Sequence, residues 1–329
     1  MNIKYVIRLI RLPNLLMMAL TMVLMRYCIV QPFAFHLKAT LSFPLSHFLL
    51  LILSVAMMAA AGYIINDYFD VKTDEVNRPD KVIIGKYISA KAAYNAYIIL
   101  NLIAICITLY LSLSLKMIRL FAIFPVVIGI LWFYSTTYKK QLLVGNILVA
   151  GITAGVPVLV GLFEIPAIYH VYHGYFLANG FTLTVVFAWI GMFSFFAFMM
   201  NLIRELVKDM EDISGDQETG RNTLPIAVGM NITKIVVATL IAFVIATLSH
   251  VFFHFLTPSC SGKFELISFL YLLVLTIIPL IIVSVLIFRA KTKKQYTLVS
   301  IILKILMLVG VLYAIVAKLN IDSCSLYVQ

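Results

Sequence analysis

The chain has 329 residues, of which 63% are hydrophobic, and its mean hydropathy is +1.06. Soluble domains are closer to half apolar, so this composition excludes an ordinary soluble protein and indicates one that crosses a membrane several times. The 25 Lys and Arg residues exceed the 14 Asp and Glu residues, which gives a net charge of +11.

A transmembrane helix needs about 20 mostly apolar residues. Nine segments meet this requirement, at residues 13–30, 46–65, 93–114, 118–134, 142–163, 181–203, 232–256, 265–288 and 298–319. The first is too long to be a cleaved signal peptide, and no small-residue cleavage site follows it. We therefore predict an all-α integral membrane protein with a single domain, residues 1–329.

Basic residues concentrate in alternate connections between the spans. They precede the first span and follow the second, fourth, sixth and eighth, at Lys4, Arg8, Arg11, Lys72, Arg78, Lys81, Lys86, Lys91, Lys139, Lys140, Arg204, Lys208, Arg221, Lys234, Arg289, Lys291, Lys293 and Lys294. Because positively charged connections stay on the cytoplasmic side, this asymmetry predicts a cytoplasmic N-terminus. Membrane topology and contact with anionic membrane lipid explain the net positive charge of the chain, and we expect no nucleic-acid partner.

An acidic segment directly follows the second span. Asn66, Asp70 and Asp74 are spaced by four, which places them on one face of a helix, with Asp67 one step around it. Carboxylates are costly near a hydrocarbon core and repel one another, and a divalent cation relieves that repulsion. The pattern therefore indicates a divalent-metal site.

A second acidic segment follows the sixth span. Asp209, Asp212 and Asp216 recur at i, i+3 and i+7, which predicts a second acidic helix face, with Glu205 one turn earlier. Lys208 lies four residues before Asp212, so a surface ion pair is an alternative role for part of this segment. Span six comes four spans after span two, so both acidic segments face the same compartment. Two matched clusters favour one shared Mg²⁺ site over two solvated helix ends.

Cations that could hold a phosphate lie near both segments, at Arg78, Lys139, Lys140, Arg204 and Lys208. Arg204 and Lys208 are one helical turn apart and could grip one diphosphate, Arg by its fork and Lys as a point charge. A topology signal explains Lys139 and Lys140 equally well. Because Mg²⁺ commonly bridges carboxylates to substrate phosphates, the combined pattern predicts prenyl transfer from a diphosphate.

These segments resemble motifs of the UbiA superfamily of intramembrane prenyltransferases. Residues 66–74 resemble its N-D-x-x-D-x-x-x-D motif, and residues 209–216 resemble its D-x-x-D-x-x-x-D motif. Residues 11–14 resemble R-x-x-N at the start of the first helix, residues 134–139 resemble Y-S-x-x-x-K, and residues 220–225 resemble G-x-x-T-L-P. The matches follow the family's order and spacing, and nine spans is also the family's count.

The resemblance implies nine helices around a central cavity, with a cytoplasmic cap built from two aspartate-rich loops. A polyprenyl diphosphate would lie there with its head under two Mg²⁺ ions. The implied metal ligands are Asn66, Asp67, Asp70, Asp74, Asp209, Asp212 and Asp216. The residues expected to be essential for catalysis are Asp70, Asp212 and Lys139, and those expected to bind substrate are Arg11, Asn14, Arg78, Tyr134, Arg204 and Lys208.

Two segments bear on the identity of the acceptor of the prenyl group. Residues 201–212 and 77–81 look most like the branch of the superfamily that adds a geranylgeranyl group to geranylgeranylglyceryl phosphate, whose own phosphate suits the surplus of cationic side chains. Residues 80–86, however, read D-K-V-I-I-G-K where archaeal and quinone enzymes usually have R-P-I-P-S-G. Prenylation of an aromatic quinone precursor is therefore an alternative.

A divalent-cation channel or transporter is a remoter alternative, because acidic rings also select cations. The absence of acidic residues at mid-depth in spans three, four, five and seven argues against it. Glu205 and the released diphosphate are alternative general bases. Cys260 and Cys324 are both expected on the extracytoplasmic side, where a disulfide and two free thiols are both compatible with their positions.

Overall fold

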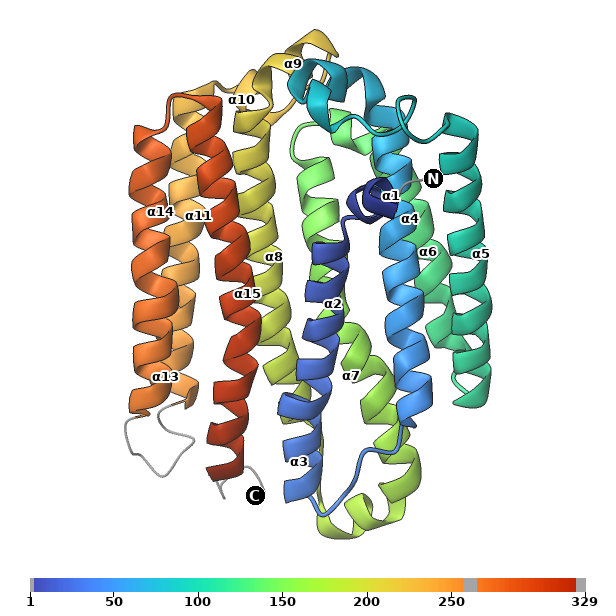
Figure 1. Cartoon of the computed structure of the whole chain (residues 1–329). Coiled ribbons are helices and arrows are strands. Elements are labelled where there is room, and N and C mark those ends of the chain that lie inside the picture. The colour runs from blue at the N-terminus through green and yellow to red at the C-terminus, as the bar shows by residue number, and fades with distance from the viewer. Residues whose placement is uncertain (1–2, 257–264, 324–329) are drawn as a thin grey trace. The chain divides into compact units, whose positions relative to one another are not determined.

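A computed structural model describes residues 3–256 and 265–323 of the chain (Figure 1). Cys260 and Cys324 lie outside the described residues. Within these ranges every regular element is a helix, apart from one isolated bridge between Ile84 and Ile88. The all-α prediction is confirmed.

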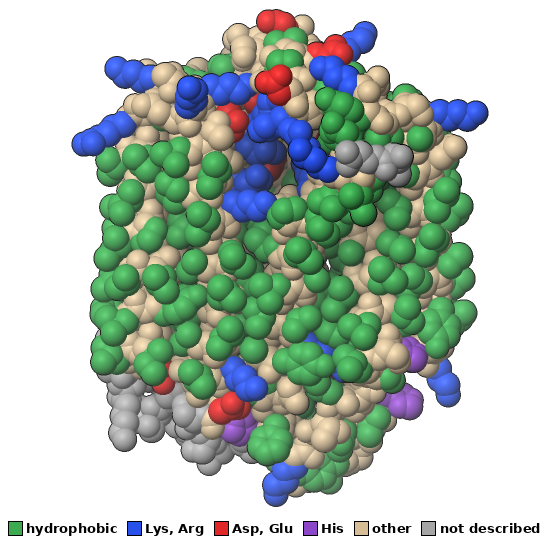
Figure 2. Space-filling view, in the orientation of Figure 1, with side chains coloured by type: hydrophobic (Ala, Val, Ile, Leu, Met, Phe, Trp, Pro, Cys, Tyr) green, Lys and Arg blue, Asp and Glu red, His purple; other side chains and the backbone are tan. Residues whose placement is uncertain are grey.

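Nine helical stretches in the described ranges are long and apolar enough to cross a membrane, which confirms the nine predicted spans. They are Leu12–His36, Leu45–Asn77, Ala90–Ser114, Ile118–Thr136, Val144–Asn179, Thr184–Glu211, Met230–Leu256, Leu266–Arg289 and Lys293–Asp322. Large hydrophobic side chains are exposed along them, for example Leu102 and Ile281. In the face shown in Figure 2, hydrophobic side chains cover the middle and charged side chains gather towards the ends. The chain is thus an integral membrane protein.

The chain divides into two compact units. Unit 1 comprises Met1–Leu20, Pro44–Val149 and Asp212–Ala227, and unit 2 comprises Thr21–Phe43, Ala150–Glu211 and Val228–Gln329. Helices α2 (Leu12–Leu24) and α7 (Val144–Asn179) contribute to both. The remaining helices of unit 1 are α1 (Ile3–Leu9), α4 (Leu45–Asn77), η2 (Pro79–Lys81), α5 (Ala90–Ser114), η3 (Ile118–Ala122), α6 (Ile123–Thr136), η4 (Tyr138–Lys140), α9 (Ile213–Glu218) and α10 (Leu224–Ala227). Those of unit 2 are η1 (Met25–Val30), α3 (Gln31–His36), α8 (Thr184–Glu211), α11 (Met230–Val251), η5 (Phe252–Leu256), α13 (Leu266–Leu270), η6 (Tyr271–Ile277), α14 (Ile278–Arg289) and α15 (Lys293–Ser323).

Helix α4 organises unit 1 and packs against α1, α5, α6 and α9 (Figure 1). It runs through the predicted second span to Asn77, because neither Gly nor Pro interrupts residues 63–78. It ends where Arg78, which precedes Pro79, adopts φ −149° and ψ 62°, as expected from the steric restriction that proline places on the residue before it. The first acidic segment is therefore wholly helical, which corrects the expectation of an aspartate-rich loop there.

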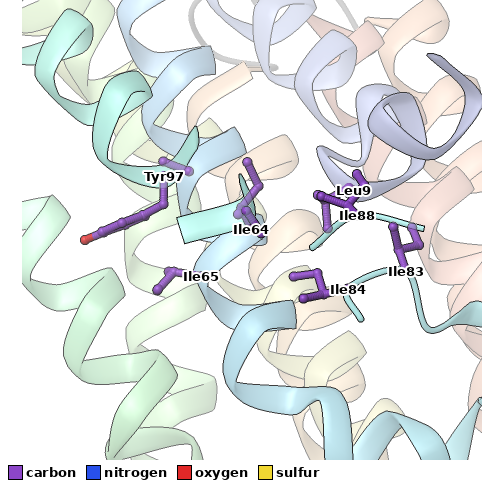
Figure 3. Close-up of a cluster of buried hydrophobic side chains, with 9 residues drawn as sticks. Leu9, Ile64, Ile65, Ile83, Ile84, Ile88 and Tyr97 are labelled. Carbon is purple, nitrogen blue, oxygen red and sulfur yellow. The ribbon is translucent and has the colours of Figure 1, made fainter. Parts of the chain in front are cut away.

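The segment that departs from the family pattern is an apolar plug. Ile83, Ile84 and Ile88 are buried together with Leu9 of α1 and Ile64 of α4 (Figure 3). Tyr87 of the same segment stacks on Tyr5 with ring centroids 3.8 Å apart. Burial of these side chains attaches both α1 and the segment to the end of α4 that carries the acidic motif.

The second acidic segment does not form one continuous helix. Helix α8 ends at Glu211, and Asp212 has the non-helical φ −104° and ψ 12° between α8 and α9. The prediction of one helix face for Asp209, Asp212 and Asp216 is therefore wrong. The residues at and after this break contact the end of α4, as described below.

Unit 2 contains a buried ion pair that sequence analysis missed. Arg26 lies in the π-helical turn η1, and its Nε is 3.1 Å from Glu164 Oε1 of α7; both side chains are almost completely buried. Helix α7 continues past the predicted end of span five at residue 163, so Glu164 lies within that span. The statement that span five lacks a mid-depth acidic residue is therefore wrong, although the pairing with Arg26 still argues against a cation pathway.

Candidate active site

The first acidic motif lies on the last three turns of α4. Asp70 is buried, whereas Asn66, Asp67 and Asp74 are partly exposed. Two cations meet on one oxygen of Asp70: Lys139 Nζ donates to Oδ1 at 2.6 Å, and Arg221 Nη2 donates to the same oxygen. Asp70 is thus the shared ion-pair partner of Lys139 and Arg221 in unit 1.

The turn after α6 positions Lys139. Helix α6 ends at Thr136, η4 follows, and Leu143 takes the left-handed φ of 60° before α7 begins. Gly145, in the first turn of α7, lies so close that an added Cβ would be 2.9 Å from Lys139 Cα and 3.2 Å from the Tyr134 ring. This close packing turns Lys139 inward, with 8% of the residue exposed, whereas Lys140 is exposed. The two adjacent lysines therefore have different surroundings.

Arg221 connects the two acidic motifs. Besides Asp70 it contacts Thr73 Oγ1 at 3.3 Å, and its Nη1 is 3.4 Å from Asp216 Oδ1. Gly220, at φ 70°, makes the turn that brings this side chain back toward α4. Arg221 was noted in the sequence only as a topology signal within the G-x-x-T-L-P match, so its central place was missed. The glycine directly before it, after a helix that carries Asp216, was the available signal.

Asp212 and Asp216 are held to the end of α4 by two further contacts. Arg78 Nη2 donates to Asp212 Oδ2 at 2.7 Å, and the Gly215 backbone N–H donates to Asn77 Oδ1 at 3.1 Å. Asp212 pairs with Arg78 in unit 1, and Lys208 pairs with Glu205 in unit 2. Contacts made by Arg78, Asn77 and Arg221 thus bring residues 212–216 against the end of α4 within unit 1.

Replacing Gly215 by alanine is expected to disturb this connection. An added Cβ would overlap the Asn77 carboxamide, so that side chain would have to shift and give up its hydrogen bond to the Gly215 N–H. We expect a loss of about 1–3 kcal/mol in the free energy of unfolding, as is usual for overpacking, measured by thermal unfolding in detergent. Gly129→Ala is the matched control, because a Cβ at Gly129 meets no atom within 4 Å; equal unfolding temperatures for the two variants would contradict the expectation.

The R-x-x-N segment also contacts the first motif. Arg11 Nη2 donates to Asp67 Oδ1 at 2.8 Å, and its guanidinium carbon lies 4.8 Å from the centre of the Tyr63 ring. Asn14 Nδ2 donates to Tyr63 Oη at 3.3 Å. Arg11 takes the left-handed φ of 52° between α1 and α2, a conformation that is costly for a non-glycine residue and indicates that its side-chain contacts hold it there.

The other predicted substrate-binding cations belong to unit 2. Arg204 Nη1 lies 3.0 Å from Glu205 Oε1, and Lys208 Nζ lies 3.2 Å from Glu205 Oε2, all on α8. Both predicted cations therefore form ion pairs with the same carboxylate, that of Glu205. Asp209 lies on the next turn of the same helix.

Burial and neighbouring charge shift two cationic groups outside the spans. Burial lowers the pKa of the Lys139 ammonium, although Asp70 opposes this effect. Burial alone would also lower the pKa of Arg221, but the carboxylates of Asp70 and Asp216 outweigh it and raise that pKa. Arg221 therefore stays charged, and its burial makes an anionic neighbour favourable.

The residues of the first motif fit a hard divalent cation. The side-chain oxygen of Asn66 is buried and accepts no hydrogen bond within the described residues, one helical turn before Asp70. Such an oxygen is a suitable ligand for Mg²⁺. Among the described residues no three Asp, Glu, His or Cys side chains already converge as a metal site. Asp67, Asp70 and Asp212 each contact an arginine or lysine instead.

Comparisons with known proteins place the chain among similar proteins of one family. The model of the UbiA prenyltransferase family matches residues 12–315. The digeranylgeranylglyceryl phosphate synthase of Methanothermobacter thermautotrophicus is 36% identical over 58% of this chain and 60% of its own length, and that of Saccharolobus solfataricus is 31% identical over 87% of each chain. The match thus spans less than two thirds of the first of these relatives.

Solved structures share the fold. A digeranylgeranylglyceryl phosphate synthase structure has a TM-score of 0.61 at 22% identity and covers 96% of this chain and 98% of that one. A UbiA homologue from Archaeoglobus fulgidus, bound to GPP and Mg²⁺, has a TM-score of 0.52 at 16% identity and covers 95% of this chain and 99% of that one.

Proposed function

Because this chain belongs to the UbiA prenyltransferase family, we propose that it transfers a geranylgeranyl group from geranylgeranyl diphosphate to geranylgeranylglyceryl phosphate, with Mg²⁺ as cofactor. The observation that carries the proposal is the meeting of carboxylates from both acidic motifs with Lys139, Arg78 and Arg221 at one end of unit 1. Carboxylates suit a divalent cation and the cations suit a diphosphate, so one cluster can hold both.

The ligands that we assign to Mg²⁺ are the oxygens of Asn66, Asp67, Asp70, Asp74, Asp209, Asp212 and Asp216. Bound Mg²⁺ would neutralise the diphosphate and stabilise the charge that develops as it leaves. The A. fulgidus homologue with GPP and Mg²⁺ supports this assignment by analogy of fold. We propose two ions, the number implied by two acidic motifs.

The reaction is a substitution at the allylic C1 carbon. The bond between C1 and the diphosphate oxygen breaks with its electron pair leaving on the diphosphate, and the acceptor's hydroxyl oxygen forms the new bond to C1 while its proton passes to a base. In our proposal Lys139 and Arg78 hold the leaving diphosphate by charge-assisted hydrogen bonds. Asn14 and Tyr134 orient the substrate, and the apolar plug around Ile83 excludes water from the reacting carbon.

The acceptor assignment draws on the relatives and on charge. Relatives that align with this chain are named digeranylgeranylglyceryl phosphate synthases. Arg204 and Lys208 add cationic groups that suit the phosphate of such an acceptor. Excess basic residues at the same ends of the spans place the N-terminus and the acidic motifs on the cytoplasmic side in this proposal.

The test is product formation by the purified protein in detergent, with geranylgeranyl diphosphate and both geranylgeranylglyceryl phosphate and dihydroxynaphthoate in one reaction. We expect digeranylgeranylglyceryl phosphate by mass spectrometry, and none after Mg²⁺ is removed with a chelator. A prenylated naphthoate would overturn the acceptor and keep the reaction type. Metal-independent turnover would overturn the role of Mg²⁺.

A further inference from the structure

We propose that Arg221 is an internal counter-ion that competes with the metal for Asp70. When metal and diphosphate both bind, its guanidinium leaves Asp70 and pairs with the diphosphate. Metal and diphosphate would then bind cooperatively because one arginine side chain links their sites. This inference rests on the proposed function and adds to it a positioning residue and a mechanism of coupled binding.

Two cationic donors crowd the Asp70 carboxylate. One carboxylate oxygen accepts from both Lys139 and Arg221, and a metal ion that binds this oxygen must displace at least one of these donors. The Lys139 side chain is 5% exposed and the Arg221 side chain 15% exposed. Arg221 also has Asp216 and Thr73 within reach, so it can leave Asp70 at lower cost than Lys139.

Backbone hydrogen bonds hold Arg221 in place. Its backbone N–H donates to the Asp216 carbonyl at 2.9 Å, and the next N–H, of Asn222, donates to the Lys140 carbonyl at 3.0 Å. The base of the side chain is thus fixed between the second motif and the turn that carries Lys139. Its tip lies between carboxylates of both motifs, where a diphosphate held by the two motifs would arrive.

The charge of the Arg221 guanidinium must remain balanced when metal binds. A guanidinium that is mostly buried cannot rely on water. When it leaves Asp70, its other anionic neighbour, Asp216, is itself an assigned metal ligand, so with metal bound it needs a further anion. The oxygens of a diphosphate match its fork of donors. Metal binding without diphosphate must therefore separate Arg221 from Asp70 with little in return, whereas with diphosphate present the arginine gains a new partner.

The consequence is a reciprocal linkage between the two ligands. Each should tighten the binding of the other by the same factor, which for linked sites is typically about 5- to 150-fold. Removing the charge of Arg221 should have opposite effects on the two: metal alone should bind more tightly, and the diphosphate should bind more weakly. A residue that only ties the motifs together would weaken both when removed.

The test uses the full chain purified in detergent. Mn²⁺ binding is measured by electron paramagnetic resonance without substrate, and binding of radiolabelled geranylgeranyl thiolodiphosphate, a slowly reacting analogue, is measured with saturating Mg²⁺. For Arg221→Gln we expect Mn²⁺ alone to bind about tenfold more tightly and the analogue about tenfold more weakly than in the unaltered protein, within the usual range of such couplings. Arg221→Lys, which keeps the charge, should restore most of both.

A matched control removes an equal charge elsewhere. Arg119→Gln, at an exposed residue of η3, should leave both affinities unchanged. If Arg221→Gln weakens both ligands or changes neither, the inference is overturned while the proposed function stands. If the unaltered protein binds neither Mn²⁺ nor the analogue, the proposed function itself is overturned.

Discussion

Replacing Asp70 by asparagine is expected to reduce prenyl transfer at least about a hundredfold, the scale typical of removing one group that stabilises a developing charge. Asp70 is buried, it is the shared partner of Lys139 and Arg221, and it lies one turn after the buried oxygen of Asn66. The neutral amide would bind a divalent cation more weakly and would leave two buried cations facing each other. Initial rates at saturating Mg²⁺ would measure the loss.

Two further variants separate catalysis from folding in this experiment. Asp70→Asn alone leaves the Lys139 charge uncompensated, and breaking a buried pair in this way is strongly destabilising. Asp70→Asn combined with Lys139→Met removes both charges, so it should regain thermal stability without regaining activity. Glu75→Gln, at an exposed position on the same helix, should behave like the unaltered protein. Near-normal rates in Asp70→Asn would contradict the metal assignment.

The spans were predictable because the lipid environment requires long apolar helices, a signal that hydropathy reads directly. Their ends were not, because polar contacts extend or end a helix without changing its apolar content. Helix α4 continues to Asn77 through the acidic motif, and α7 continues through Glu164, which Arg26 pairs within unit 2. In both cases a tertiary partner stabilises a charged side chain that a hydropathy profile treats as a boundary.

The site was predictable in its residue types and less so in its contacts. Spacing by four correctly placed Asn66, Asp70 and Asp74 along α4. The second motif resembled a helix face equally well, yet the contacts of Arg78 and Asn77 accompany a break at Asp212 that periodicity cannot show. Apart from the glycine before it, nothing in the sequence set Arg221 apart from other basic residues, because its contact with Asp70 joins residues that are 151 apart in the sequence.

The loop after the first motif shows what a comparison of motifs cannot predict. Its departure from the family pattern raised a question about the acceptor, but a motif comparison gives no account of what the substituted residues do. In the structure Ile83, Ile84 and Ile88 are buried against Leu9 and Ile64, so the substitution serves packing between α1 and α4. The apolar plug can therefore stand in place of the family's usual sequence at this position while the aspartates of the first motif are unchanged.

Lys139→Met is expected to lower turnover about a hundredfold, whereas Lys140→Met should stay within about twofold of the unaltered protein, because only a group aligned with the developing charge contributes on that scale. Lys139 Nζ lies 2.6 Å from Asp70 Oδ1 and is nearly enclosed, while the side chain of Lys140 is exposed. The two variants remove the same charge from adjacent residues, so general electrostatics would affect them about equally. A specific contact would affect only the first.

The kinetic form of the loss distinguishes two roles for Lys139. If Lys139 holds the diphosphate in the ground state and the transition state alike, KM for geranylgeranyl diphosphate should rise while kcat changes little. If it stabilises the leaving group, kcat should fall together with kcat/KM. We expect the second result, because negative charge on the diphosphate grows as the C1–oxygen bond breaks and a buried cation interacts with that added charge more strongly than an exposed one. Equal rates for the Lys139 and Lys140 variants would show that the ammonium on Asp70 serves only to balance the charge of α4.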